Sequence, residues 1–377
     1  MKNLIFILSI LFFSCSTPPE RSEAFVIEYE KTPDANFFEI FDFANARLVC
    51  PGARDSIYLS HKLVMAFGKD FIAALDKAQE QVFLFDMQGN FLRRIGMPGN
   101  GPGEYNRPSY IQIDQDDQAL DVRCNDGLTV MSYGLDGSFA RSFEPPVDAN
   151  SFARVNSDLY YFYSGHENPN LDFRLHRCNT TTVLDSYLPL KSKAFELSEQ
   201  SFFSSGNEGF FREPFIPEVY QYDSEGIRAF LRVDFGDAGI TKEMLENVQD
   251  PYVFFSGIMD KGFSTIVSVF KGTDLAVLST NHQSNQGRDQ TYIVVNTSEK
   301  TTVKSVFSNL YDVFVEEDIF RAELVHVDSD EQAFFLIDSG FLEKLMDASI
   351  IQLPDNSCFE YNENPFLVVV PIGVTAP

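Results

Sequence analysis

The sequence has no tryptophan, few basic residues and only one long apolar run. Lys and Arg number 29 against 55 Asp and Glu, which gives a formal net charge of −26. This charge repels phosphate backbones, and no basic patch offsets it, so we expect no nucleic-acid partner. The 38 Phe and 15 Tyr residues favour strands over helices.

The long apolar run is MKNLIFILSILFFS, residues 1–14. It is too short to cross a bilayer as a mature helix and is typical of a secretory signal. Ser14 directly before Cys15 resembles a bacterial lipobox, although Phe12 stands where Leu is usual. The alternative is an ordinary signal peptide with an unrelated Cys. We expect residues 1–14 to be a lipoprotein signal peptide and Cys15 to carry the lipid.

The residues after Cys15 are polar and include prolines, as in a tether. We therefore expect a lipidated flexible tether over residues 15–35 and a folded domain over residues 36–377. Ser16 does not resemble the Asp that retains lipoproteins at the inner membrane. The protein is thus expected in the cell envelope, as an outer-membrane lipoprotein held to the membrane by its N-terminal lipid.

The remaining cysteines contain no C-x-x-C pair and have no paired His, so a zinc site is not expected. All four lie in or beside apolar, strand-like runs. We favour buried free thiols over disulfides, although an oxidising envelope would allow either state. These residues are Cys50, Cys124, Cys178 and Cys358.

Pairs of strands recur along the chain. VFLFDMQGNFLRRIG (82–96) aligns with VMSYGLDGSFARSFE (130–144), and Gly89 and Gly137 occupy equivalent turns. Each copy has the pattern of strand, tight turn and strand, and another strand pair precedes it. Four strands per unit, repeated about every 40–50 residues, is typical of propeller blades.

The pattern predicts an all-β fold, a six-bladed β-propeller with four-stranded antiparallel blades. The last unit is one strand short, so we expect residues 37–50 to complete it and close the ring without an exposed sheet edge. Short helices are expected at 241–248 and 340–347. The predicted blades are residues 62–96, 108–144, 150–190, 201–236, 262–308 and 310–372.

A glycine-rich stretch, RRIGMPGNGPGEYNRPSYIQID (93–114), joins the first two predicted blades. A phosphate-binding Walker loop requires Gly-Lys-Ser/Thr and a following helix, whereas Glu104 and Tyr105 follow Gly103 here. A dinucleotide site also needs a helix, and the next element alternates as a strand does. We interpret the stretch as a sharp turn between blades.

This junction resembles that of an NHL-type repeat, G-x-G-P-G-E-F/Y followed by Pro and an inner strand. More closely, residues 36–377 resemble the six-bladed β-propeller lipoproteins of Bacteroidetes. The matching features are the lipobox, the junction, VDFG at 233–236 and the closing Asn-Pro at 364–365. The resemblance implies the propeller fold and brings no catalytic residues.

Two acidic stretches resemble metal-binding loops without completing one. DQDDQALD (114–121) begins like a calcium loop, but Gln118 and Ala119 replace required residues and Asn125 stands in place of the bidentate Glu. We interpret it, and VDSDEQ (327–332), as solvated turns. We expect no bound metal and no cofactor.

The histidines are scattered singly, so none is a good candidate for catalysis. Several loop residues should nevertheless meet on one face, because connections between second and third strands lie on the same face as junctions between blades. Converging Arg and aromatic side chains suit anionic or sugar-like ligands. The candidate ligand-binding residues are Tyr105, Arg107, His166, Arg212, His282 and Arg288; ordinary long polar loops are the alternative.

The sequence contains no complete catalytic constellation. We therefore favour a non-enzymatic ligand-binding or scaffold protein of the cell envelope. Its partners would be a carbohydrate, a peptide, an anionic small ligand or an envelope protein. The alternative is a propeller hydrolase or lyase, lactonase-like or NHL-like, with a metal in the central channel.

Overall fold

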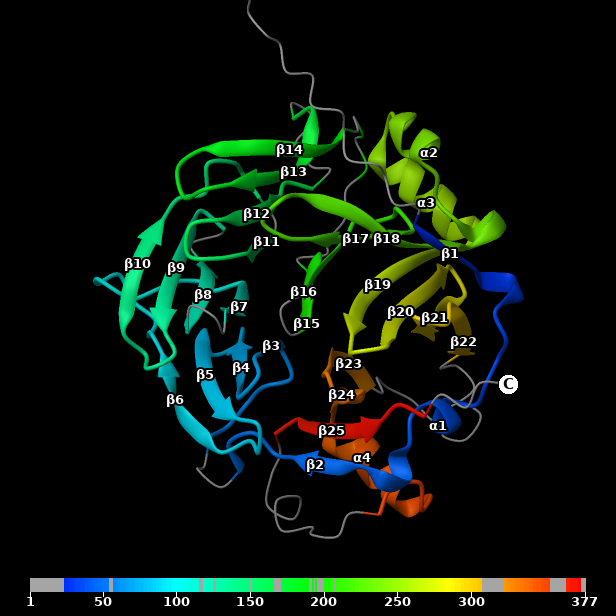
Figure 1. The fold of residues 1–377 in the computed structure, drawn as a ribbon, viewed down its shortest axis with the longest axis horizontal. Helices are drawn as coiled ribbons and strands as arrows, with labels where there is room; N and C mark the ends of the chain where they lie inside the picture. The colour runs from blue at the N-terminus through cyan, green and yellow to red at the C-terminus, as the bar shows by residue number, and fades with distance from the viewer. Residues whose placement is uncertain are drawn as a thin grey trace, which may run out of the picture.

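The structure, a computed structural model, describes residues 24–53, 57–114, 118–124, 127–149, 151–165, 171–189, 192, 194, 200–205, 208–306, 322–352 and 364–373. Among these residues, six sheets surround a common centre, and each contains four antiparallel strands of one blade (Figure 1). The prediction of a six-bladed propeller is confirmed. The part of the chain that is described contains no helix long and apolar enough to cross a membrane.

Blades 1 to 3 follow chain order from the innermost strand outwards. Their phenylalanines, tyrosines and aliphatic residues fill the spaces between neighbouring blades. The strands are β3 (Leu63–Phe67), β4 (Phe71–Asp76), β5 (Gln81–Asp86) and β6 (Phe91–Ile95); β7 (Tyr110–Asp114), β8 (Ala119–Cys124), β9 (Thr129–Gly134) and β10 (Phe139–Phe143); β11 (Ser151–Arg154), β12 (Tyr160–Tyr163), β13 (Phe173–Cys178) and β14 (Val183–Pro189).

Blades 4 to 6 share the largest core cluster, and two of them accept a strand from the N-terminal segment. The strands are β15 (Phe202–Ser205), β16 (Glu208–Arg212), β17 (Glu218–Tyr222) and β18 (Ile227–Asp234); β19 (Phe263–Lys271), β20 (Leu275–Ser284), β21 (Gly287–Asn296) and β22 (Thr301–Val306); β23 (Ala322–Val327), β24 (Gln332–Ile337) and β25 (Phe366–Pro371).

The ring is closed by β2 (Arg47–Val49), which pairs antiparallel with β25 as the outermost strand of blade 6. Arg47 lies opposite Val369, and Val49 lies opposite Leu367. The expectation that residues 37–50 complete the last blade is confirmed. Before β2, the short helix α1 (Phe37–Ile40) and η2 (Phe43–Asn45) pack Phe37, Phe41 and Phe43 around Phe335.

A strand also lies inside the segment predicted as a tether. β1 (Phe25–Glu28) pairs in parallel with β18, and Ile27 of β1 is buried in the core. After the single turn η1 (Tyr29–Lys31), Asp34 forms a bridge with Lys304 of blade 5. Residues 25–35 are therefore not a free tether, because they cross the outer edges of blades 4 and 5.

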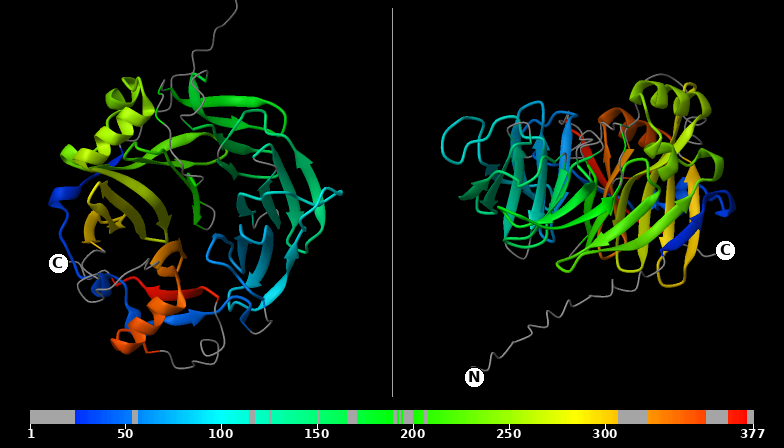
Figure 2. Two further views of the ribbon diagram at one scale, coloured as in Figure 1. Left: turned by 180° about the vertical axis from the view of Figure 1, so that it is seen from behind. Right: turned by 90° about the horizontal axis from the view of Figure 1, so that it is seen from above.

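The helices that follow blade 4 and strand β24 lie on one side of the ring, where the chain passes between strands or blades (Figure 2). α4 (Ser339–Asp347) confirms the helix expected at 340–347. η4 (Gly236–Ala238), α2 (Lys242–Glu246) and α3 (Pro251–Lys261) connect blade 4 to blade 5. Sequence reasoning missed α3, whose PYVFFSGIMDK is rich in aromatic and β-branched residues that favour strands.

The cysteines differ in state. Cys124 and Cys178 are buried free thiols, as expected, and burial raises the pKa of each to about 12. Cys50 is disulfide-bonded, so the expectation of a free thiol is wrong for this residue. The expectation for Cys358 falls outside the described residues.

Candidate binding face

The alternation of antiparallel strands gives the propeller two different faces. Turns between first and second strands, and between third and fourth strands, lie on what we call the tight-turn face. Connections between second and third strands, and between blades, lie on the loop face. Arg107 in the junction of blades 1 and 2 donates its backbone N–H to Glu80, in the turn between β4 and β5, which places both on the loop face.

The tight-turn face is stabilised mainly by its own side chains. An Asp or Asn accepts backbone N–H groups from residues two to four positions further along the chain, which fixes the turn. Gly89 and Gly137 take left-handed φ angles of 83° and 88° in two of these turns. The capping residues are Asp86, Asp136, Asn156, Asn179, Asp223, Asn296 and Asp328.

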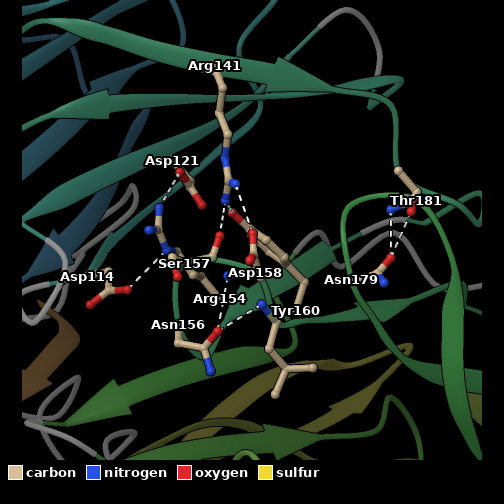
Figure 3. A network of polar contacts seen from close by, with 11 residues as sticks. Asp114, Asp121, Arg141, Arg154, Asn156, Ser157, Asp158, Tyr160, Asn179 and Thr181 are labelled. Carbon is tan, nitrogen blue, oxygen red and sulfur yellow. Dashed lines mark hydrogen bonds and ion pairs between the residues drawn. The ribbon is translucent and has the colours of Figure 1, made fainter.

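The acidic stretch at 114–121 takes part in blade packing. Arg154 of blade 3 lies between two carboxylates of blade 2, with Nε 3.0 Å from Asp114 Oδ2 and Nη1 3.1 Å from Asp121 Oδ1 (Figure 3). All three side chains are largely buried. Both carboxylates thus pair with the Arg154 guanidinium. In the second acidic stretch, 327–332, Asp328 accepts backbone N–H groups of its own turn.

The glycine-rich junction encloses a carboxylate of its own. Gly101 donates its N–H to Glu104 Oε2 at 2.8 Å, and a Cβ at Gly99 would collide with that same oxygen. Tyr105 then pairs with the start of the loop, because its N–H donates to Met97 and its carbonyl accepts from Gly99. The interpretation of a turn between strands agrees with this geometry.

Tyr105 itself is fully buried between blades 1 and 2. Its hydroxyl donates to the carbonyl of Ile95 at 2.9 Å and accepts from the N–H of Val82 at 3.1 Å. Its ring approaches Gly96 so closely that a Cβ there would lie 2.6 Å from a ring carbon. The side chain predicted to face a ligand is instead part of the core.

Arg212 also departs from the expectation of an exposed loop residue. It is the last residue of β16, is 3% exposed, and donates from Nη2 to the carbonyl of Gln200 at 3.1 Å. Residues 207–215 were expected to connect the second and third strands, but the second strand itself occupies 208–212. Replacing Arg212 should therefore disturb folding as well as the binding of any ligand.

His282 and Arg288 lie on one hairpin of blade 5, at its loop-face end. Arg288 is exposed, whereas His282 is half-buried and its Nδ1 lies 3.0 Å from Ser264 Oγ. Arg107 is exposed but belongs to blades 1 and 2, across the ring. The predicted residues thus share a face without forming one cluster; His166 and Cys15 fall outside the described residues.

Sequence reasoning missed a charged cluster on the loop face between blades 3 and 4. The Arg174 guanidinium pairs with the Glu213 carboxylate, and both side chains are buried. Burial raises the pKa of Glu213, and Arg174 opposes that rise. Beside them, Tyr220 donates to Glu218, whose Oε2 lies 3.7 Å from Lys242 Nζ of α2. Charged residues within FRLHRC and directly after GFFR were the available signal.

This cluster supports the loop face and does not by itself form a reactive site. The Arg174–Glu213 pair ties blade 3 to blade 4, and Lys242 links α2 to blade 4 through Glu218. Among the described residues, no group of three or more His, Cys, Asp or Glu side chains is arranged to hold a metal ion. The arrangement can orient polar groups of a ligand through charge, without a defined nucleophile and base.

Exposed large apolar side chains are unevenly distributed. In the part of the chain that the structure describes, they occur on outermost strands or at the loop face and not in the tight turns. Those on the outermost strands are Val26, Leu92, Phe139, Val183 and Leu184. Those at the loop face are Tyr58, Met97, Leu128, Phe173, Met244, Tyr252, Val253 and Phe255.

Comparison with known proteins identifies relatives of similar fold. A family model described as "Domain of unknown function (DUF4934)" matches residues 55–371. A Bacteroides fragilis protein, provisionally described as exported, superposes with a TM-score of 0.72 at 15% identity, over 93% of this chain and 99% of that one. A DUF4221 member from Bacteroides vulgatus gives 0.52 at 12% identity, over 87% and 98%. No curated protein matches.

Proposed function

The chain belongs to the DUF4934 family, and we propose that it is an exported, lipid-anchored propeller that binds a partner or ligand through its loop face without transforming it. The observation that carries this proposal is the distribution of exposed apolar side chains. Tight turns lack them in the described residues, whereas the loop face displays eight. Large exposed apolar side chains on a rigid frame are typical of binding surfaces.

The direction of β1 supports a particular orientation at the membrane. β1 runs parallel to β18, which starts at the tight turn of blade 4 and ends at the loop face. The chain therefore enters the propeller from the tight-turn side. If Cys15 carries a lipid, residues 16–24 span at most about 30 Å. The tight-turn face then lies towards the membrane, and the loop face points away from it.

The lipobox resemblance and the similarity to a Bacteroides fragilis protein described as exported support a location in the cell envelope, and we propose the outer membrane. The resemblance to NHL-like propellers remains a prediction. A carbohydrate, a peptide, an anionic small ligand or an envelope protein would each suit a face that combines Arg, Tyr and apolar side chains.

A face-selective binding measurement tests the proposal. Glu225→Cys in a tight turn and Leu128→Cys on the loop face each provide a biotinylation site, since Cys124 and Cys178 are buried. The two proteins are immobilised and screened with one panel of envelope and plant oligosaccharides, peptides and purified envelope proteins. We expect binding to the protein anchored through Glu225→Cys and at least tenfold less to the other.

Equal binding by both immobilised proteins would place the site away from the loop face. Turnover of any panel member would instead favour the hydrolase or lyase alternative. Leu184→Cys, on the outermost strand β14, is the control. It attaches the protein through neither face and shows how much binding is lost through immobilisation alone.

A further inference from the structure

The α3 helix is held rigidly on the loop face. Its inner side buries Ile258 and packs Phe254 and Met259 against the core formed by Phe215 and Phe263. Asp250 caps its N-terminus by accepting the N–H groups of Tyr252 and Val253 at 2.8 and 3.2 Å. At the other end, the carbonyl of Met259 accepts from Asn285 at 3.1 Å. The helix that carries the outer side chains is therefore fixed to the propeller at both ends.

The N-terminal half of the outer side of this helix is apolar. Tyr252 and Val253 are 76% and 70% exposed, the highest values among the exposed large apolar side chains described, and Phe255 is also exposed. Tyr252 and Phe255 are three residues apart and lie on the same side of a helix. Aromatic side chains held in this way are typical of the residues that dominate protein–protein binding energy.

The surroundings of α3 are acidic. The segment 234–261 contains six carboxylates and two lysines, and Lys242 already lies near Glu218. The whole chain carries a net charge of −26. A second copy of the chain and an anionic lipid surface would both be repelled. Charge complementarity instead favours an occupant with Lys or Arg around an apolar pocket.

We propose that α3, through Tyr252, Val253 and Phe255, is the docking site of an envelope protein that offers an apolar pocket with a basic rim. The inference rests on the proposed function, since it makes the loop face the face turned towards the partner. It goes further by selecting one helix of that face and a protein of stated chemistry as its occupant.

Photo-crosslinking in living cells tests the proposal with the full-length protein. A benzophenone amino acid replaces Val253, Leu128 at the loop face of blade 2, or Leu184 on the outer strand β14; all three positions are exposed. We expect a discrete crosslinked protein from position 253 and none from position 184. The captured protein is then identified, purified and measured against the full chain.

With this purified protein, the double variant Tyr252→Ser, Val253→Ser should bind at least tenfold more weakly, and Leu184→Ser should bind as the wild type does. Glu243→Gln, Glu246→Gln should weaken binding several-fold, because these carboxylates lie on α2 within the same acidic segment. Higher salt should reduce the wild-type affinity and reduce that of the Gln variant less.

A crosslink from position 253 only to lipid, only to another copy of the chain, or to nothing would overturn the inference. Unchanged affinity in the Ser double variant would do the same. Capture at position 128 without capture at 253 would contradict the α3 site while leaving the loop face as the binding face. Capture at position 184 alone would contradict both.

Discussion

At the scale of single residues, His326 shows how a charge-bearing side chain can serve packing alone. It is almost fully buried at the inner edge of blade 6. Its ring stacks on Phe67 of blade 1 with 4.6 Å between centroids and meets Phe334 edge-on at 5.3 Å. Burial lowers the pKa of His326 from 6.5 to about 3, so the ring is neutral in the folded protein at neutral pH.

This burial predicts a pH dependence of stability. Below pH 6.5 the unfolded chain takes up a proton at this residue, whereas the folded chain does not until about pH 3. The free energy of unfolding should therefore fall as the pH falls through that range, by about 1.4 kcal/mol per unit. His326→Phe keeps a stacking ring but has no proton to take up. Between pH 6.5 and 5, its free energy of unfolding should fall by about 2 kcal/mol less than that of the wild type.

Chemical denaturation at several pH values measures the effect. His61→Gln, at an exposed position, is the matched control and should retain the wild-type dependence. The idea fails if His326→Phe and the wild type lose the same stability between pH 6.5 and 5.

Tyr105 marks where residue-level prediction stops. Sequence reasoning located the junction and its face correctly but could not tell an exposed tyrosine from a buried one. The burial depends on Gly96, whose missing side chain leaves room for the ring, and on the N–H of Val82. Such contacts join residues that are distant in sequence, so spacing alone does not reveal them. Arg212 was misplaced for a related reason, because strand bounds were uncertain by several residues.

At the scale of elements, the N-terminal segment contributes to three blades. β1 extends blade 4, Asp34 bridges to blade 5, and β2 completes blade 6. The aromatic ring of Tyr29 packs near Phe235, and its hydroxyl lies 3.0 Å from Thr291 Oγ1. The repeats made the blades and the role of β2 predictable. β1 belongs to no repeat, and four residues are too few for their sequence pattern to distinguish a strand from a tether.

Stepwise truncation of this segment has graded expected results. Deleting residues 16–23 should leave the melting temperature unchanged. Deleting residues 16–31 removes the β1 ladder and the buried Ile27, and should cost about 3 kcal/mol and lower the melting temperature by several degrees. Deleting residues 16–50 also exposes the edge of β25 and should cause aggregation.

Calorimetry and size-exclusion chromatography distinguish these three deletions. A 16–31 deletion as stable as the wild type would mean that β1 adds no stability. A monomeric and equally stable 16–50 deletion would contradict the closure of blade 6 by β2.

At the scale of the whole molecule, we propose that one face is turned towards the membrane anchor and the other binds a partner. The chain enters from the tight-turn side, and the loop face carries α2, α3 and α4 and eight of the exposed large apolar side chains among the described residues. The fold was predictable because each blade repeats the same local pattern, in which strands of alternating apolar and polar residues are joined by tight turns. The proposed binding face was predictable only as a face, since α3 lies in an insertion between blades 4 and 5 that has no counterpart in the other blades as far as the structure describes them.

Anchoring gives a direct test at this scale. Cys15→Ala should remove the lipid attachment site and shift the protein from the membrane to the soluble fraction after cell lysis. Ser16→Ala, one residue further on, should remain with the membrane. Fractionation followed by immunoblotting measures both, and a Cys15→Ala protein that stays membrane-bound to the wild-type extent would contradict the lipoprotein assignment.

The closure of blade 6 has a consequence for the timing of folding. Arg47–Val49 pair with residues about 320 positions later in the chain. β2 therefore waits for β25, which is synthesised about 320 residues later, and the ring stays open until β25 has been made. Until then, β2 and the aromatic residue Phe37 of α1 lack their partners. We expect this interval to be the period when the chain most needs a chaperone.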